Sequence, residues 1–335
     1  MAASSPALLT GLLQTVSRSF YLTMRVLPAG IRPQISLAYL LARTTDTIAD
    51  TQLLPPERRL HALRTLRERI VESSGAPLDF GEFARLQGSE AERMLLERVE
   101  ESLAVLRQFP DTDRDRIRDV LATITGGQEL DLRRFASARQ DRIVALATDA
   151  ELDDYTYRVA GCVGEFWTRT CRAHLFPDVV LDDAFLLTNG VRFGKGLQLV
   201  NILRDLPADL RQGRCYLPAE RLTAAGVEPA ALLDPANEAR IRPLYDEYLA
   251  LAEAHLAAGW QYTNRLPRAI VRLRLACAWP ILIGVRTLSR LRHGRVLSPQ
   301  SRIKVSRPEV RRLILSTVVR YPWRSAWEKL FEEAH

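Results

Sequence analysis

The sequence is poor in lysine, although it is basic. Lysine occurs only at 195, 304 and 329, so nearly all of the 47 Lys and Arg side chains, set against 40 Asp and Glu, are arginine. The planar guanidinium group suits bidentate contact with phosphate oxygens, but a codon bias toward arginine would produce the same composition. The net charge of +7 fits an anionic substrate, an anionic membrane surface or nucleic acid, and does not choose among them.

Several signatures of other protein classes are missing. The four cysteines form no CxxC pair, and the five histidines form no HExxH or other zinc-binding spacing. No P-loop, GxSxG or GxGxxG motif occurs. The longest apolar run, residues 275–285, is about half of what spans a bilayer, and the first residues lack the features of a signal peptide. We therefore expect a reduced, cytoplasmic protein without a transmembrane segment.

Apolar residues recur at helical spacing along most of the chain. Two such series are Leu60, Leu63, Leu66 and Ile70, and Leu95, Val99, Leu103 and Leu106. Strand-like alternation is scarce, and no repeat or low-complexity linker divides the chain. With 47% hydrophobic and 26% charged residues among 335, the sequence predicts a single all-α domain over residues 1–335, built from ten or more helices.

The segment SLAYLLARTTDTIAD, expected to form a helix, carries a polar row. Tyr39, Arg43, Asp46 and Asp50 step by four, three and four residues and so share one face. Buried charges without partners are costly. Mg²⁺ and a diphosphate would be the missing partners, because Mg²⁺ takes carboxylate and phosphate oxygens. A DxxxD spacing by itself also occurs on solvated helix faces.

The same spacing returns in GLQLVNILRDLPADLRQGRCYLP. Gln198, Asn201, Asp205 and Asp209 share a helical face, and the apolar residues that flank them indicate a buried segment whose polar row lines a cavity. Two such rows on facing helices would form a metal-binding mouth over the central cavity of a helical bundle.

Three further residues belong to this second segment. Arg204 and Arg214 stand close to the aspartates in the sequence and would bind phosphate oxygens. Pro207 lies between the two aspartates, where it removes an intrahelical hydrogen bond or bends the helix. We therefore expect Asp209 to lie slightly off the line of the row.

Four motifs in order resemble the squalene and phytoene synthase family over nearly the whole chain. VSRSFYLTMRVLP resembles its N-terminal substrate segment, RTTDTIAD and NILRDLPADLRQGRCYLP its two aspartate-rich motifs, and YTYRVAGCVG its central tyrosine segment. The resemblance implies the all-α fold of the class I isoprenoid synthases, Mg²⁺ and prenyl diphosphate substrates. Where eukaryotic squalene synthases carry an acidic residue before the second aspartate of the first motif, this chain has Ala49. Their C-terminal membrane anchor is also absent here, which favours a bacterial-type soluble or peripheral enzyme.

The resemblance also implies roles for individual residues. Metal-binding and catalytic aspartates would be Asp46, Asp50, Asp205 and Asp209. Contacts with diphosphate would come from Arg18, Arg43, Arg204 and Arg214, and polar contacts from Gln198 and Asn201. The substrate channel would be lined by Ser17, Phe20, Tyr39, Tyr155, Val159 and Val163. NADPH would contact Arg18, Arg43, Arg204 and Lys304.

The implied reaction joins two farnesyl diphosphates head to head. Mg²⁺ and arginines would neutralise the departing diphosphate, so that an allylic cation forms in a pocket closed to water. Tyr155 would help to remove the proton that closes the ring of presqualene diphosphate, although a buried core tyrosine is its alternative role. Phe20, Tyr39 and Trp167 would steady cations through their rings. Reduction with NADPH would then give squalene, which the stretch SRIKVSRPEV favours by its resemblance to bacterial squalene synthases.

Other readings of the sequence stay open. Within the family, the product would be phytoene or dehydrosqualene if reduction does not occur, or the enzyme would carry out one half-reaction only. Outside it, Arg311, Arg312 and Arg320 would let a basic helical protein bind a membrane or nucleic acid, which leaves both aspartate rows unexplained. We expect no nucleic acid and no obligate protein partner, and a peripheral contact with the inner face of the membrane for product release.

Overall fold

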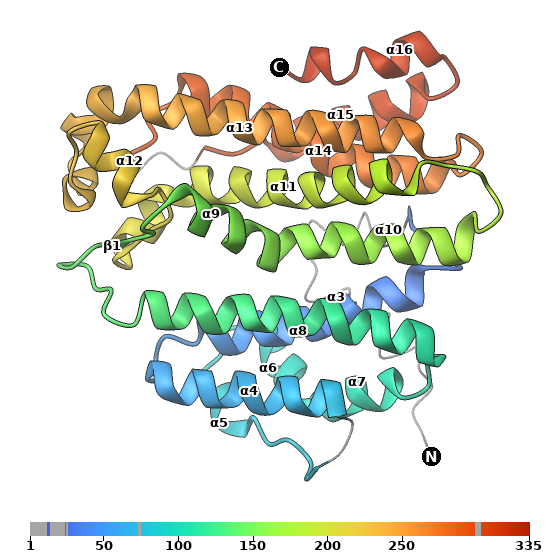
Figure 1. Cartoon of the computed structure of the whole chain (residues 1–335), viewed down its shortest axis with the longest axis horizontal. Coiled ribbons are helices and arrows are strands. Elements are labelled where there is room, and N and C mark those ends of the chain that lie inside the picture. Colours follow the sequence, from blue (N-terminus) through green and yellow to red (C-terminus); the bar gives the residue numbers. More distant parts are fainter. Residues whose placement is uncertain (1–11, 14–23, 25, 73–74, 299–302) are drawn as a thin grey trace. The chain divides into compact units, whose positions relative to one another are not determined.

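The computed structural model describes residues 12–13, 24, 26–72, 75–298 and 303–335. The chain divides into two compact units: unit 1 comprises Met1–Arg133 and Phe166–Val179, and unit 2 comprises Arg134–Glu165 and Val180–His335. The predicted all-α class is confirmed, because the described residues form helices with two short strands (Figure 1). No helix of the described ranges is long and apolar enough to cross a bilayer.

Unit 1 consists of helices joined by short turns. They are α3 (Arg32–Asp50), α4 (Pro56–Glu72), α5 (Gly81–Arg85), α6 (Glu90–Glu97), α7 (Val99–Leu106) and α8 (Asp111–Arg134), whose last residue belongs to unit 2. In the first apolar series predicted from spacing, Leu63, Leu66 and Ile70 of α4 are buried, and Leu60 is half-buried. The second series is divided between α6 and α7, because the backbone at Arg98 leaves the helical region, with φ −105° and ψ 21°.

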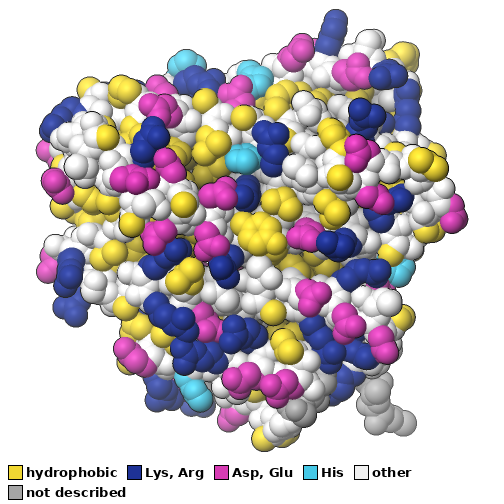
Figure 2. All heavy atoms as spheres, in the orientation of Figure 1, with side chains coloured by type: hydrophobic (Ala, Val, Ile, Leu, Met, Phe, Trp, Pro, Cys, Tyr) yellow, Lys and Arg dark blue, Asp and Glu magenta, His cyan; other side chains and the backbone are white. Residues whose placement is uncertain are grey.

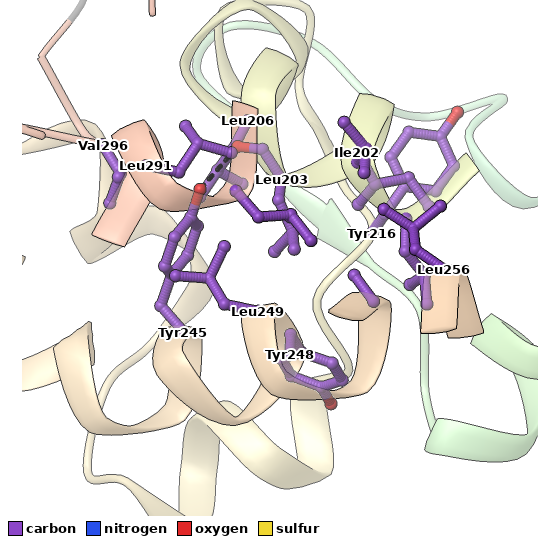
Figure 3. Packing of buried hydrophobic residues seen from close by; sticks show 14 of the residues in the cluster. Ile202, Leu203, Leu206, Tyr216, Tyr245, Tyr248, Leu249, Leu256, Leu291 and Val296 are labelled. Atoms are coloured by element: carbon purple, nitrogen blue, oxygen red, sulfur yellow. Dashed lines mark hydrogen bonds between the residues drawn. The ribbon is translucent and has the colours of Figure 1, made fainter. Parts of the chain in front are cut away.

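Unit 2 is built around three long helices. α11 (Asp183–Arg211) packs along α13 (Glu238–Arg265), and α13 along α14 (Val271–His293). The remaining elements are α9 (Asp149–Thr156), the π-helix η1 (Tyr157–Gly161), α10 (Cys162–Leu175), α12 (Ala219–Ala224), η2 (Pro229–Leu233), η3 (Pro235–Asn237), α15 (Arg307–Arg320), α16 (Arg324–Glu328) and η4 (Glu332–Ala334). α10 crosses into unit 1 at Phe166. Figure 3 shows part of the apolar core that α11 and α13 share.

A two-residue parallel ladder ends the second aspartate segment, and the sequence pattern did not predict it. β1 (Val144–Ala145) pairs with β2 (Arg214–Cys215), with Val144 opposite Arg214. Gly213 precedes β2 with φ 81°, and a Cβ there would lie 2.3 Å from the backbone nitrogen of Arg139. Only glycine fits this turn, which therefore fixes the backbone that carries Arg214.

The π-helix interrupts the helical run that carries Tyr155. One extra residue per turn at η1 rotates the residues that follow it, and such bulges are frequent at functional sites. After it, α10 approaches α11 so closely that a Cβ at Gly164 would lie 1.8 Å from the carbonyl oxygen of Gly190. Glycine is required there by the contact between the two backbones.

Candidate active site

The first polar row lies on α3, as its spacing predicts. The helix begins at Arg32, with Pro33 in its first turn, where the missing N–H of proline costs no hydrogen bond. One face is buried and carries Leu37, Leu40, Leu41, Thr44 and Ile48. The polar row lies on the other face: Tyr39, Arg43 and Asp46 are half-buried and Asp50 is exposed.

Two side chains of unit 1 lie close to the Asp46 carboxylate. Nε2 of Gln128, on α8, donates a 2.5 Å hydrogen bond to Oδ1 of Asp46. Arg43 lies 3.9 Å from Oδ2 of Asp46, but it lies closer to Glu92 of α6, at 2.5 Å. Burial, and next the negative charge of Asp50, raise the pKa of Asp46 to about 7 against the lowering effect of Arg43 and Gln128. Because 46% of the Asp46 side chain is open to solvent, a small cation would reach its carboxylate.

The second polar row lies on α11. The helix begins after Asp182, whose side chain accepts a 2.9 Å hydrogen bond from the N–H of Phe185. Its buried face carries Leu199, Val200, Ile202, Leu203, Leu206 and Leu210. The polar row lies on the more open face: Gln198, Asp205 and Asp209 are half-buried, and Asn201 is exposed.

Arg204 forms an ion pair with Asp205, the next residue in the sequence. Its Nε lies 2.9 Å and its Nη2 2.5 Å from the two carboxylate oxygens of Asp205. The hydrogen bond to Asp205 raises the pKa of Arg204 further. A phosphate that binds Arg204 would therefore share this guanidinium with Asp205, or would displace the Asp205 carboxylate from it.

Pro207 does not break α11, because a tyrosine on another helix replaces the missing hydrogen bond. In an α-helix the carbonyl of residue 203 accepts from the N–H of residue 207, which proline lacks. The hydroxyl of Tyr245, on α13, donates a 2.9 Å hydrogen bond to the carbonyl of Leu203 instead (Figure 3). The helix continues to Arg211, and Asp205 and Asp209 stay on one continuous element.

Tyr155 belongs to a chain of aromatic rings in unit 2. Its ring stacks on Tyr216, with centroids 4.8 Å apart, and Tyr216 contacts Phe135 edge to face at 5.2 Å. The guanidinium of Arg214 lies 5.8 Å from the centroid of Phe135. Through these rings Tyr155 is joined to β2, the strand near the end of the second aspartate segment.

The other predicted site residues are distributed over the chain. Val159 lies half-buried on η1, Val163 is exposed on α10, and Trp167 lies half-buried on α10 in unit 1. Lys304 is exposed between α14 and α15, and its carbonyl accepts a hydrogen bond from Arg290. Ser17, Arg18 and Phe20 lie outside the described residues. The two aspartate rows lie in different units, so their facing each other stays a prediction.

The carboxylate pairs suit Mg²⁺ that arrives with its substrate. Within the described residues no three His, Cys, Asp or Glu side chains gather as a ready metal cage. Mg²⁺ is commonly held by one or two carboxylates together with substrate phosphates and water, and the negative charge of Asp50 is one cause of the raised pKa of Asp46. The residues present therefore fit this metal, with Asp46 and Asp50 in unit 1 and Asp205 and Asp209 in unit 2.

Two of the predicted NADPH contacts are already bound by carboxylates of the protein. Arg43 is engaged by Glu92 and Arg204 by Asp205, whereas the Lys304 side chain is exposed. A nucleotide phosphate would compete with carboxylates for the first two.

Sequence reasoning missed three residues that support the rows. Gln128 contacts Asp46, Tyr216 stacks on Tyr155, and Tyr245 supports the turn of α11 at Pro207. The sequence signal for Gln128 is limited to the polar group that it forms with Glu129 and Asp131 on α8, a helix rich in charged residues in which the structure buries these three. No signal in the sequence pointed to Tyr245 apart from Pro207, which lies inside an expected helix.

Comparisons with known proteins identify the family of this chain. A family model described as squalene/phytoene synthase matches residues 13–309. Presqualene diphosphate synthase of Rhodopseudomonas palustris is 30% identical over 259 residues, which cover 76% of this chain and 77% of that protein. Botryococcus squalene synthase of Botryococcus braunii is 27% identical over 319 residues and 91% of this chain, but the chain spans only 62% of that protein's length.

A solved structure agrees in fold. A structure of TcSQS in complex with a ligand has a TM-score of 0.76 and 22% identity, and the match covers 99% of both chains. At this identity the likeness concerns the fold alone, and it confirms the predicted isoprenoid synthase bundle. Because the family model matches most of the sequence and two aspartate rows lie on its helices, this chain belongs to the squalene/phytoene synthase family.

Proposed function

We propose that this protein joins two farnesyl diphosphates head to head to presqualene diphosphate and reduces the product to squalene with NADPH. The observation that carries the proposal is the pair of carboxylate rows on α3 and α11, in a chain of this family. We take residues 1–335 to act as one squalene/phytoene synthase-like domain.

The proposed roles follow from the charges around each row. Mg²⁺ would supply the positive charge that the departing diphosphate needs as it leaves. Asp46 and Asp50 would hold it in unit 1, and Asp205 and Asp209 in unit 2. Arg43, Arg204, Arg214 and Arg18 would bind phosphate oxygens, with Gln198 and Asn201 as polar contacts and Ser17, Phe20, Tyr39, Val159 and Val163 along the prenyl chains.

We assign the ring-closing proton to Tyr155. Its phenol would accept a proton as a weak base without trapping the allylic cation. The stacking of Tyr155 on Tyr216 supports this role, since the ring is held by packing while the hydroxyl carries the chemistry. The same ring faces would steady a cation near them.

NADPH would supply the hydride that completes squalene. Arg18, Arg43, Arg204 and Lys304 would contact it, and the exposed side chain of Lys304 is accessible for such a contact. Phytoene or dehydrosqualene would be the products of an enzyme without this reduction.

A second candidate is an enzyme that stops at presqualene diphosphate. It is favoured by the 30% identity with the presqualene diphosphate synthase of R. palustris. Both candidates use the aspartate rows in the first half-reaction, and they differ only in the use of NADPH.

We propose a cytoplasmic enzyme that touches the membrane peripherally to release an apolar product, with no nucleic acid and no obligate protein partner. On the face that Figure 2 draws, acidic and basic side chains are interspersed. Nucleic-acid binding needs basic side chains gathered into a patch or stripe.

The test is a product analysis. The purified protein is incubated with farnesyl diphosphate and Mg²⁺, with and without NADPH, and the lipids are identified by mass spectrometry. Squalene that forms only with NADPH supports the first candidate, and presqualene diphosphate under both conditions supports the second. Absence of any coupled C30 product in a folded protein would contradict both.

A further inference from the structure

A pocket lies in unit 2 at the ends of α13 and α15, among residues that no proposed catalytic role uses. Its volume is about 300 Å³. The residues that line it include Arg268, Arg274 and Arg324, the aromatic side chains Tyr321 and Trp327, and Glu328. Three arginines against one carboxylate leave this pocket positively charged.

Arg274 is the deepest of these cations and has no carboxylate to balance it. Only 7% of its surface is exposed, and among the described residues no Asp or Glu forms an ion pair with it. Its Nη2 donates a 2.7 Å hydrogen bond to Asn264, while no described residue accepts a hydrogen bond from its buried Nε. Burial lowers the pKa of Arg274, as expected for a guanidinium removed from water without an anion.

Aromatic rings hold the Arg274 guanidinium in place. It lies 5.2 Å from the ring centroid of Trp327 and 5.6 Å from that of Tyr321. Nε1 of Trp327 donates a 2.7 Å hydrogen bond to the same Asn264 oxygen that Arg274 uses. A preorganised, unbalanced cation at the base of a pocket is an arrangement that binds an oxyanion.

The helix that leads to this pocket exposes its apolar side. On α15, Leu315 is 62% exposed, and Val318 and Val319, one turn further along, are also exposed. The fully buried residue among those of α15 is the polar Thr317. Trp323 follows the helix and is 62% exposed.

Basic residues precede this apolar face on the same helix. Arg311 and Arg312 are exposed one turn before Leu315. α15 thus presents two exposed arginines, then exposed aliphatic side chains, then a tryptophan beside the positively charged pocket. Exposed apolar groups flanked by arginine, with tryptophan at the edge, are typical of helices that lie on a membrane surface.

We propose that α15 and the turn to α16 form a docking surface for an anionic phospholipid bilayer, with a lipid phosphate in the Arg274 pocket. The proposal rests on the membrane contact of the proposed function and names its location. The family model ends at residue 309, so nearly all of this surface lies outside the matched region. Figure 1 shows α16 beside the C-terminus of the chain.

The physical chemistry of both parts points to the same partner. The exposed aliphatic side chains of α15 and Trp323 would move out of water into the layer between the lipid headgroups and the acyl chains. The arginines would gain from the negative surface potential of the bilayer and lose that gain in high salt. The buried Arg274 would receive the anion that the protein does not supply.

The experiment measures binding to vesicles without substrate. The full chain is floated with vesicles of phosphatidylcholine alone and of phosphatidylcholine mixed with phosphatidylglycerol, at low and high salt. We expect flotation with the mixed vesicles that weakens in high salt. Leu315→Ser with Val319→Ser should lower the partition coefficient more than about tenfold, and Arg311→Gln with Arg312→Gln about fivefold for each charge removed.

The pocket is tested at its exposed rim rather than at buried Arg274. Arg268→Gln with Arg324→Gln should weaken vesicle binding, since both are lining residues that face solvent. Matched controls are Val180→Ser, a fully exposed valine elsewhere in unit 2, and Arg107→Gln, an exposed arginine of unit 1. Both controls should float as the wild type does.

Several results would overturn the proposal. The wild-type chain would fail to float with the mixed vesicles, or the α15 variants would float as well as the wild type. Alternatively, the two control variants would lose vesicle binding to the same extent as the α15 variants. Binding of a DNA duplex that the α15 variants abolish, with vesicle binding unchanged, would do the same. Coupling activity is measured separately in detergent micelles. Activity there without flotation contradicts the docking surface alone, and flotation without coupled product contradicts the reaction alone.

Discussion

The hydroxyl of Tyr245 donates a hydrogen bond to the carbonyl of Leu203, the group that Pro207 leaves without its helical partner. Tyr245 is fully buried, and burial raises the pKa of its phenol, so the hydroxyl stays a donor at all physiological pH values. Through this bond α13 supports the part of α11 that carries both aspartates of the second row.

Removal of this hydroxyl should destabilise the protein through one unsatisfied carbonyl. Tyr245→Phe should lower the free energy of unfolding by about 1 to 3 kcal/mol, the cost of a buried polar group without a partner. In a Pro207→Ala background the restored N–H of residue 207 satisfies the carbonyl, and the same change should cost less. Denaturant unfolding of all four proteins gives the coupling energy, and a coupling near zero would contradict the explanation.

Loss of either aspartate row should impair the first half-reaction. Asp46→Asn and Asp205→Asn should each reduce the formation of presqualene diphosphate and weaken the binding of Mg²⁺. Each change removes one carboxylate ligand from a metal ion, so the negative charge of the departing diphosphate is less well neutralised. The intermediate carries one diphosphate, so one of the two variants should still convert supplied presqualene diphosphate with NADPH. The measurement is a product profile with each substrate, with Asp178→Asn, an exposed aspartate of unit 1, as control. Wild-type rates in both variants, or full turnover in excess chelator, would exclude the mechanism.

The hydroxyl of Tyr155 should matter for rate and little for folding. Tyr155→Phe keeps the ring that stacks on Tyr216 and should lower the turnover rate by roughly 10² to 10⁴, the usual range for a group that transfers a proton. Its melting temperature should stay near that of the wild type. Tyr157→Phe is the matched control, because its hydroxyl contacts Glu165 and has no proposed role in the reaction. Equal rates for both variants would assign the proton to another group.

The stability of unit 2 should depend on pH through His255. Burial, and next the charges of Arg192 and Lys195, lower the pKa of His255 from 6.5 to about 4. The folded form therefore binds fewer protons than the unfolded chain between these values, and stability should fall as pH decreases from 6.5 to 4, by about 1 to 3 kcal/mol.

Unfolding free energies measured across that window test this linkage. His255→Asn should remove the part of the slope that His255 contributes. His61→Asn, at an exposed histidine on α4, should leave the slope unchanged. A wild-type slope that survives the His255 substitution would show that other groups cause it.

The two aspartate rows should face each other across one cavity. Spin labels on α3 and α11, next to Asp46 and Asp205, should give distances below about 27 Å, five turns at the α-helical pitch, once both diphosphates and Mg²⁺ are bound. A longer distance in a complex that turns over would contradict a shared cavity.

Local spacing in the sequence is enough to establish which side chains share a helix face. The steps of three and four residues that align Tyr39, Arg43, Asp46 and Asp50 depend only on the period of the α-helix, and α3 has them as predicted. The order of four short motifs likewise indicates the family from the sequence alone, because each motif is a run of neighbouring residues.

The surroundings of those rows depend on tertiary packing. Gln128 stands 82 residues from Asp46 in the sequence, and Tyr245 stands 42 residues from Leu203. No local period connects residues so far apart, so their contacts depend on how whole helices pack. The raised pKa of Asp46 and the continuity of α11 through Pro207 are consequences of that packing, since burial and distant hydrogen bonds set them.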